Sequence, residues 1–77
     1  MPKLEKKLKI LNRLQQLRQK HHLTQEDLAQ AVDVTRATII ALEKGNYNPS
    51  LELAFRLAQF FKMKIDTIFY LQGNKYE

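Results

Sequence analysis

One face of a helix expected at residues 35–44 combines side chains that suit neither a protein core nor an ordinary charged surface. Successive residues advance about 100° around a helix, so five side chains share a sector of roughly 140°. These are Arg36, Ala37, Ile40, Ala41 and Lys44. An arginine fork matches the O6 and N7 acceptors of guanine, and small apolar groups match the methyl group of thymine. The mixture therefore favours a surface that contacts base edges, although a single exposed apolar residue such as Ile40 is also common on surfaces without a function.

Two short helices joined by a tight turn must position this face. Thr24 and Thr35 each precede a helical pattern and carry a hydroxyl that can accept a backbone N–H, and Asp27 lies three residues after Thr24, close to a capping-box spacing. Asp33 lies at the turn, where we expect a left-handed backbone at a cost of roughly 1–2 kcal/mol. Apolar contacts between the helices are expected from Leu28, Ala29, Val32, Val34, Thr38, Ile39 and Leu42. The pattern predicts a helix-turn-helix over about residues 24–44.

The segment TQEDLAQAVDVTRATIIALEKGNYNPSLELAFRLAQFF resembles the helix-turn-helix of the phage-repressor/Cro family, also called the XRE type. The similarity runs from about Leu14 to Phe69 and includes the IIALEKG, NPS and IDTIF sequences. Two positions depart from the family pattern, because Asp33 stands where the family prefers glycine and Lys64 where it prefers a serine-like cap. The resemblance implies a recognition helix that starts near Thr35 and enters the major groove, and a dimer on a two-fold related operator.

The resemblance also implies roles for individual positions. Contacts to the DNA backbone are implied for Gln25, Thr35, Lys44, Asn46 and Tyr47. Base or near-base contacts are implied for Arg36, Ala37, Thr38 and Ala41, to which the helix face adds Ile40. An ion pair between the first helix and the end of the recognition helix is implied for Arg18 and Glu43. We therefore expect a DNA site with a guanine bound by Arg36, worth roughly 1–3 kcal/mol of discrimination, beside thymines against the apolar residues.

The rest of the chain also has a helical apolar pattern. Spacings of four and three residues predict one long N-terminal helix from about residue 3 to 20, with Leu4, Leu8, Leu11, Leu14 and Leu17 on its stripe. Ser50 is expected to cap a strongly apolar fourth helix that contains Leu51, Leu53, Ala54, Leu57, Ala58 and Phe61. The sequence IDTIFYL, residues 65–71, predicts a short fifth helix. Because alternating strand patterns are absent, we expect an all-α, five-helix DNA-binding fold with an extended N-terminal helix.

Length and charge limit the classes of protein to which this chain can belong. Its 77 residues predict one domain, residues 1–77, with a basic helical arm at about 1–12 and a polar tail at about 72–77. Residues 1–20 hold seven basic groups and one acidic group, a charge of +6 within a total of +5. The pI near 9.7 favours a nucleic-acid partner. A solvated lysine face and binding to an anionic membrane are the alternatives for the basic arm alone.

Several classes of site are not expected. The chain has no cysteine, which excludes disulfides and thiolate metal sites and suits a cytoplasmic location. No apolar run approaches the roughly 18 residues of a membrane span. His21 and His22 lack a nearby carboxylate or cysteine that would complete a metal site. Without a glycine-rich phosphate loop or a nucleophile beside a base, we expect neither a cofactor nor enzymatic activity.

Two surfaces are candidates for a dimer interface. Tyr70 and Leu71 end the predicted fifth helix with an apolar group, and Leu4 and Leu8 extend the stripe of the first helix beyond the usual core. We expect a homodimeric transcription regulator, a repressor above all, that binds double-stranded DNA. One alternative is an antitoxin-type module that neutralises a partner toxin and autoregulates its operon, and another is a basic helical domain that binds DNA without sequence preference.

Overall fold

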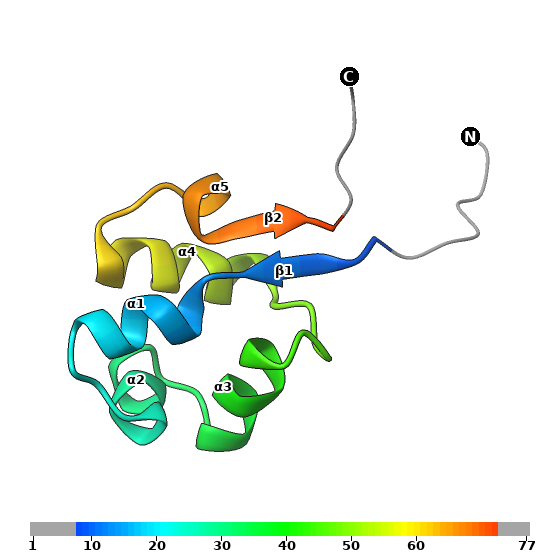
Figure 1. The fold of residues 1–77 in the computed structure, drawn as a ribbon. Helices are drawn as coiled ribbons and strands as arrows, with labels where there is room; N and C mark the ends of the chain where they lie inside the picture. The colour runs from blue at the N-terminus through cyan, green and yellow to red at the C-terminus, as the bar shows by residue number, and fades with distance from the viewer. Residues whose placement is uncertain (1–7, 73–77) are drawn as a thin grey trace.

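The computed structural model describes residues 8–72, in which five helices and two short strands are present (Figure 1). In chain order these are β1 (Ile10–Asn12), α1 (Leu14–Lys20), α2 (Gln25–Ala31), α3 (Arg36–Glu43), α4 (Leu51–Phe61), α5 (Ile65–Ile68) and β2 (Phe69–Leu71). Figure 1 shows the α2–α3 pair at the bottom of the view, the strands at the upper right, and α1 and α4 between them. The helix-turn-helix and the five helices expected from the sequence are therefore present.

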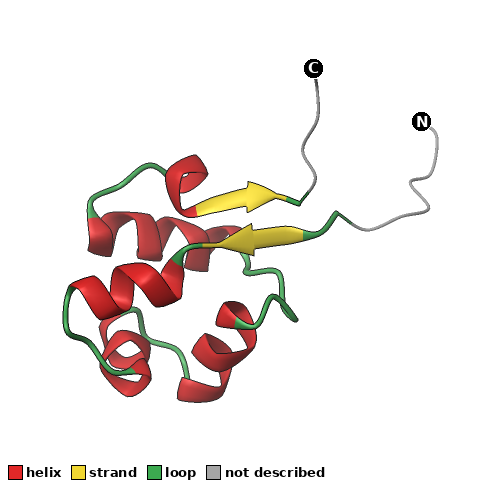
Figure 2. Ribbon diagram, viewed as in Figure 1, coloured by secondary structure: helices red, strands yellow, loops and turns green. Residues whose placement is uncertain are grey.

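The two strands form a small antiparallel sheet that the sequence did not predict (Figure 2). Ile10 pairs with Leu71, Leu11 with Tyr70, and Asn12 with Phe69. Strands of three residues are too short to show a period-2 apolar pattern, so the fold is mostly helical and not all-α as expected.

The expected N-terminal helix from about residue 3 to 20 is wrong in its first half. Helix α1 begins at Leu14, residues 10–12 are extended, and the earlier part of the expected helix, with Leu4, lies outside the described residues. The backbone N–H of Arg13 donates to the carbonyl of Ile68 at 3.0 Å. Pairing with the end of the chain thus satisfies backbone groups that a helix would have satisfied internally.

The expected fifth helix is also shorter than predicted. It ends at Ile68, and Phe69 has the extended angles φ −113° and ψ 143°. Tyr70 and Leu71 consequently lie on β2 and do not end a helix. Lys64 stands at the N-cap of α5 without a side-chain hydrogen bond, as its departure from a serine-like cap implies.

The core lies where the helices meet. Its largest fully buried side chains are Leu14, Leu28, Ile39, Leu42, Leu57 and Ile68, which come from all five helices. Five of the six apolar residues expected on α4 are buried, but Leu51 is 73% exposed. Leu51 occupies the first turn of α4 on the side turned away from this core.

Candidate nucleic-acid interface

The corner between α2 and α3 is built from the local signals that predicted it. The Thr24 hydroxyl accepts the Asp27 backbone N–H at 2.9 Å, and the Asp27 carboxylate accepts the Thr24 backbone N–H at 2.9 Å. These two bonds, the backbone one first, hold the pKa of Asp27 below its usual value. Asp33 has φ 62°, the left-handed backbone expected at the turn. The Val34 N–H then donates to the Ala29 carbonyl at 2.9 Å, which closes the corner and directs α3 across α2.

Helix α3 buries one side and presents another to solvent. Thr35 caps its first turn by accepting the Thr38 backbone N–H at 3.2 Å, and Ile39 and Leu42 are fully buried. On the predicted base-reading face, Arg36, Ala37 and Lys44 are exposed, while Ile40 and Ala41 are half-buried. Thr38 is half-buried, with its hydroxyl 3.1 Å from the Thr35 hydroxyl. The five side chains of the mixed face thus all retain accessible surface.

The cations on this face are available to an anion. The ion pairs found among residues 8–72 involve Arg18 and Arg56 as cations, so neither Arg36 nor Lys44 is neutralised within that part of the chain. An exposed guanidinium presents five N–H donors in a planar fork. The start of α3 therefore offers donors to a ligand, and its sides offer small apolar groups.

Gln25 begins α2 with its amide directed toward the end of α3. Its Nε2 donates to Glu43 Oε1 at 3.1 Å. A glutamine amide nitrogen carries two N–H donors, so one remains for a ligand such as a phosphate. The bond to Glu43 also fixes the side chain, and a group that is already ordered loses less entropy when it binds.

Arg18 and Glu43 form the ion pair that joins α1 to the end of α3. Arg18 Nε lies 2.7 Å from Glu43 Oε2, and Nη2 donates to Oε1 at 3.1 Å. The Arg18 and Glu43 side chains are only 12% and 6% exposed. Arg18 Nη1 also donates to the Leu23 carbonyl at 3.0 Å. The hydrogen bond to Glu43 is the main reason that the pKa of Arg18 lies above its usual value.

The loop after α3 begins with a glycine cap. Gly45 has φ 77° and its N–H donates to the Leu42 carbonyl at 3.0 Å, while the Asn46 N–H donates to the Ala41 carbonyl at 3.1 Å. This pattern is a Schellman cap, which requires a left-handed residue. Asn46 and Tyr47 follow it and are exposed, beside Lys44 at the helix end. Three of the residues expected to contact the DNA backbone are therefore adjacent.

The sequence interpretation missed Asn12, which joins three elements. Its Nδ2 donates to the Leu42 carbonyl of α3 at 2.8 Å, and its Oδ1 accepts the Leu14 N–H of α1 at 3.1 Å. Its backbone belongs to β1 and pairs with Phe69 of β2. An asparagine just before a helical pattern is a typical capping residue, which was the one local signal available.

Lys9 was also missed as an individual residue. Its Nζ donates to the Gly45 carbonyl at 3.3 Å. It lines a hollow of about 380 Å³ together with Leu8 and residues 45–48. Strand β1 thus brings a positive charge to the same loop that carries Asn46 and Tyr47.

The candidate dimer residues lie on the sheet side of the molecule. Tyr70 is partly exposed, and the Arg13 guanidinium stacks over its ring at 4.5 Å from the centroid. Leu71 is half-buried, and Leu8 is 62% exposed just before β1. Leu4 lies outside the described residues.

Two further features concern metals and membranes. No cluster of three or more histidine, cysteine, aspartate or glutamate side chains suited to a metal ion occurs in residues 8–72. Over the same range, none of the helices has the length and apolar content needed to cross a membrane.

Comparison with known proteins places this geometry in context. A family model described as helix-turn-helix matches residues 14–68, which span α1 to α5 and leave both strands outside. An uncharacterized HTH-type transcriptional regulator of Methanocaldococcus jannaschii is 53% identical over 64 residues, covering 83% of this chain and 97% of that protein. The cryptic phage CTXphi transcriptional repressor RstR of Vibrio cholerae is 35% identical over 54 residues, covering 70% of this chain and 49% of that protein.

A solved structure has the same fold. The crystal structure of a transcriptional regulator from Listeria innocua matches with a TM-score of 0.69 at 28% identity. The match covers 83% of this chain and 61% of that chain.

Proposed function

The chain belongs to the XRE-type helix-turn-helix family of DNA-binding transcriptional regulators, and we propose that it is a repressor that binds a palindromic operator as a homodimer. The observation that carries the proposal is the outer face of α3. That face combines an unpaired arginine with small apolar side chains on an eight-residue helix. A helix with its side chains is roughly 10–12 Å across and fits a major groove about 12 Å wide.

The contacts divide by the chemistry of each side chain. Arg36 donates to the O6 and N7 acceptors of a guanine, which is the commonest specific contact in the major groove. Ala37, Ile40 and Ala41 lie against thymine methyl groups, and Thr38 lies at the edge of this surface. The half-burial of Ile40 and Ala41 limits them to contact through their outer atoms.

Phosphate contacts flank the base contacts on both sides. Gln25 and Thr35 stand at the starts of α2 and α3, and Lys44, Asn46 and Tyr47 follow the end of α3. Helix N-termini carry free N–H groups and a partial positive charge, and lysine adds a full charge. These contacts fix the position of α3 without selecting a sequence.

Dimerisation and repression follow from the size of the reading surface. One short recognition helix reads only a few base pairs, and a two-fold pair reads two half-sites about 34–36 Å apart. Repression is favoured by the similarity to RstR, whose name describes a transcriptional repressor. A dimer bound over a promoter excludes polymerase without any further domain.

Selection of bound sequences from a random pool of duplex DNA tests the proposal. We expect an enriched palindrome with a guanine in each half-site, and a cell-free transcription assay in which the protein lowers transcription from a promoter that overlaps the palindrome. Absence of an enriched motif would rule out sequence-specific regulation.

The role of Arg36 needs a matched pair of variants. Arg36→Lys keeps the charge but loses the planar fork, whereas Arg36→Ala loses both. We expect both variants to lose roughly 1–3 kcal/mol of preference for the guanine. Only Arg36→Ala should also reduce the salt dependence of binding. Unchanged base preference in both variants would remove Arg36 as a reader.

A further inference from the structure

Helix α4 exposes two large apolar side chains one turn apart. Leu51 is 73% exposed and Phe55 is 54% exposed. Residues four apart lie on the same helix face, so the two side chains are neighbours on the surface. Isolated exposed apolar residues are common, but these two adjoin a larger apolar feature.

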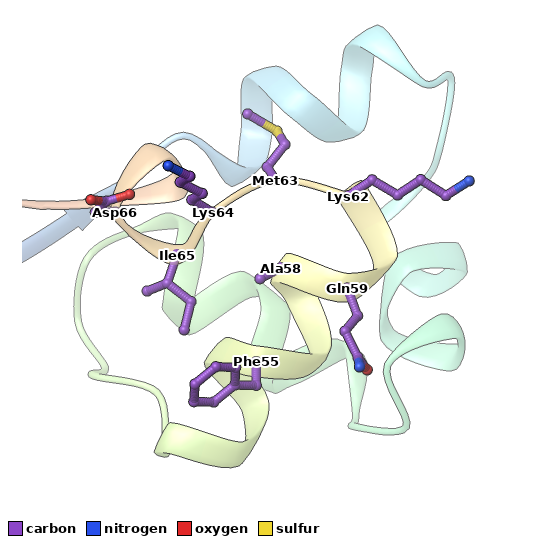
Figure 3. Close-up of a pocket in the computed structure, with 8 residues that line it drawn as sticks. All are labelled: Phe55, Ala58, Gln59, Lys62, Met63, Lys64, Ile65 and Asp66. Carbon is purple, nitrogen blue, oxygen red and sulfur yellow. The ribbon is translucent and has the colours of Figure 1, made fainter.

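That feature is an open groove between α4 and α5 with a volume of about 670 Å³. Its apolar lining consists of Phe55, Ala58, Met63 and Ile65. Figure 3 shows Phe55 and Ile65 directed into the same space beside Ala58, at the point where α4 ends and α5 begins. Leu51, Phe55 and the groove thus form one continuous apolar surface, which we name the α4–α5 face.

The charges at the edge of this face are arranged to match a second copy of themselves. Lys64 and Asp66 are exposed on either side of Ile65, and both border the groove. Neither belongs to the ion pairs found within residues 8–72. A two-fold axis beside Ile65 brings Lys64 of each copy to Asp66 of the other, because a symmetric contact pairs residue i with j and j with i.

We propose that the α4–α5 face binds the α4–α5 face of a second copy of the chain. This inference rests on the homodimer of the proposed function and identifies the surface that forms it. The face shares no residue with the predicted DNA contacts on α2, α3 and the loop that follows, so a dimer of this kind leaves both recognition helices accessible. It also differs from the strand side that carries Leu8, Tyr70 and Leu71.

Sedimentation equilibrium of the full chain tests the inference with a matched pair of leucines. Leu51→Ser and Leu8→Ser make the same change at exposed sites on different sides of the molecule. We expect Leu51→Ser to weaken dimerisation about 100-fold or more, because a symmetric interface loses each side chain twice. We expect Leu8→Ser to change it less than about twofold. Circular dichroism checks that both variants retain the wild-type helical signal.

Charge exchange tests the predicted symmetry directly. Lys64→Glu and Asp66→Lys each place like charges together in their own homodimers, which should weaken by about tenfold. Mixing the two variants restores two opposite-charge pairs, so a heterodimer as tight as the wild-type dimer should form. Failure of the mixture to associate better than either variant alone would overturn the two-fold contact at Ile65.

The outcomes separate this inference from the proposed function. A wild-type dimer that Leu8→Ser dissociates and Leu51→Ser does not would overturn the α4–α5 face and leave the DNA-binding homodimer intact. A dimer that Leu51→Ser dissociates, with no palindrome selected by the wild type, supports the face and overturns the proposed operator. A wild-type chain that is monomeric at all concentrations overturns both.

Discussion

Replacement of Arg18 by methionine should remove a large part of the stability of this protein. The change keeps the apolar stem and removes the donors and the charge, so Glu43, with a side chain that is 6% exposed, retains only the amide of Gln25 as a side-chain partner. Breaking one side of a buried pair costs 3–5 kcal/mol. Because Arg18 keeps 12% of its exposure, we expect the lower end of that range, about 3 kcal/mol.

This loss is large beside the total. A chain of 77 residues is expected to have a free energy of unfolding of about 4–12 kcal/mol. A loss of about 3 kcal/mol should therefore lower Tm by about 12 °C or more. Urea unfolding followed by circular dichroism measures the change by linear extrapolation.

An exposed ion pair of almost the same length provides the control. Arg56 Nη2 lies 2.6 Å from Glu52 Oε2, but these side chains are 40% and 74% exposed. Arg56→Met should cost much less than Arg18→Met, because water screens the pair and can solvate the remaining carboxylate. The double variant Arg18→Met/Glu43→Leu removes both buried charges and should recover most of the loss. If Arg18→Met costs no more than Arg56→Met, the burial argument is refuted.

Three further substitutions test individual contacts. Asn12→Ala should cost about 1–3 kcal/mol in urea unfolding because it leaves the Leu42 carbonyl and a helix N–H without their partner, and Asn12→Ser, which keeps a local acceptor, should recover part of it; equal losses would show that the bond to Leu42 dominates. Asp33→Gly should raise stability by up to about 1 kcal/mol, because glycine adopts φ 62° without steric cost, and a fall in Tm would contradict this. Asp27→Asn should be less stable than wild type above pH 4, because hydrogen bonds from Thr24 lower the pKa of Asp27 in the folded state; the difference should shrink as pH falls through that pKa, and a difference independent of pH in thermal unfolding would exclude the mechanism.

The helix-turn-helix was predictable because its signals are local. A threonine cap, an acidic residue three positions later and a left-handed turn residue act over a few residues, and each forms the contact that its position implies. The glycine cap at Gly45 belongs to the same class. For such elements the residue types and their spacing are sufficient.

The ends of the described chain were not predictable in this way. The leucine spacing before Leu14 is compatible with a helix, and only the encounter with residues 69–71 makes residues 10–12 a strand. The contact between Arg13 and Thr67 joins residues 54 positions apart. No local pattern reports a partner at that distance, so a helix was expected where the tertiary structure forms a sheet.

By itself, therefore, the sequence determined the family, the recognition helix and the mixed face of Arg36, Ala37 and Ile40, because these depend on helical period and capping. Only the tertiary structure decided that Asn12 holds the end of α3 from 30 residues away and that Leu51 faces solvent. Both depend on which surfaces meet when the helices pack. That packing is set by the whole chain and by no single segment of it.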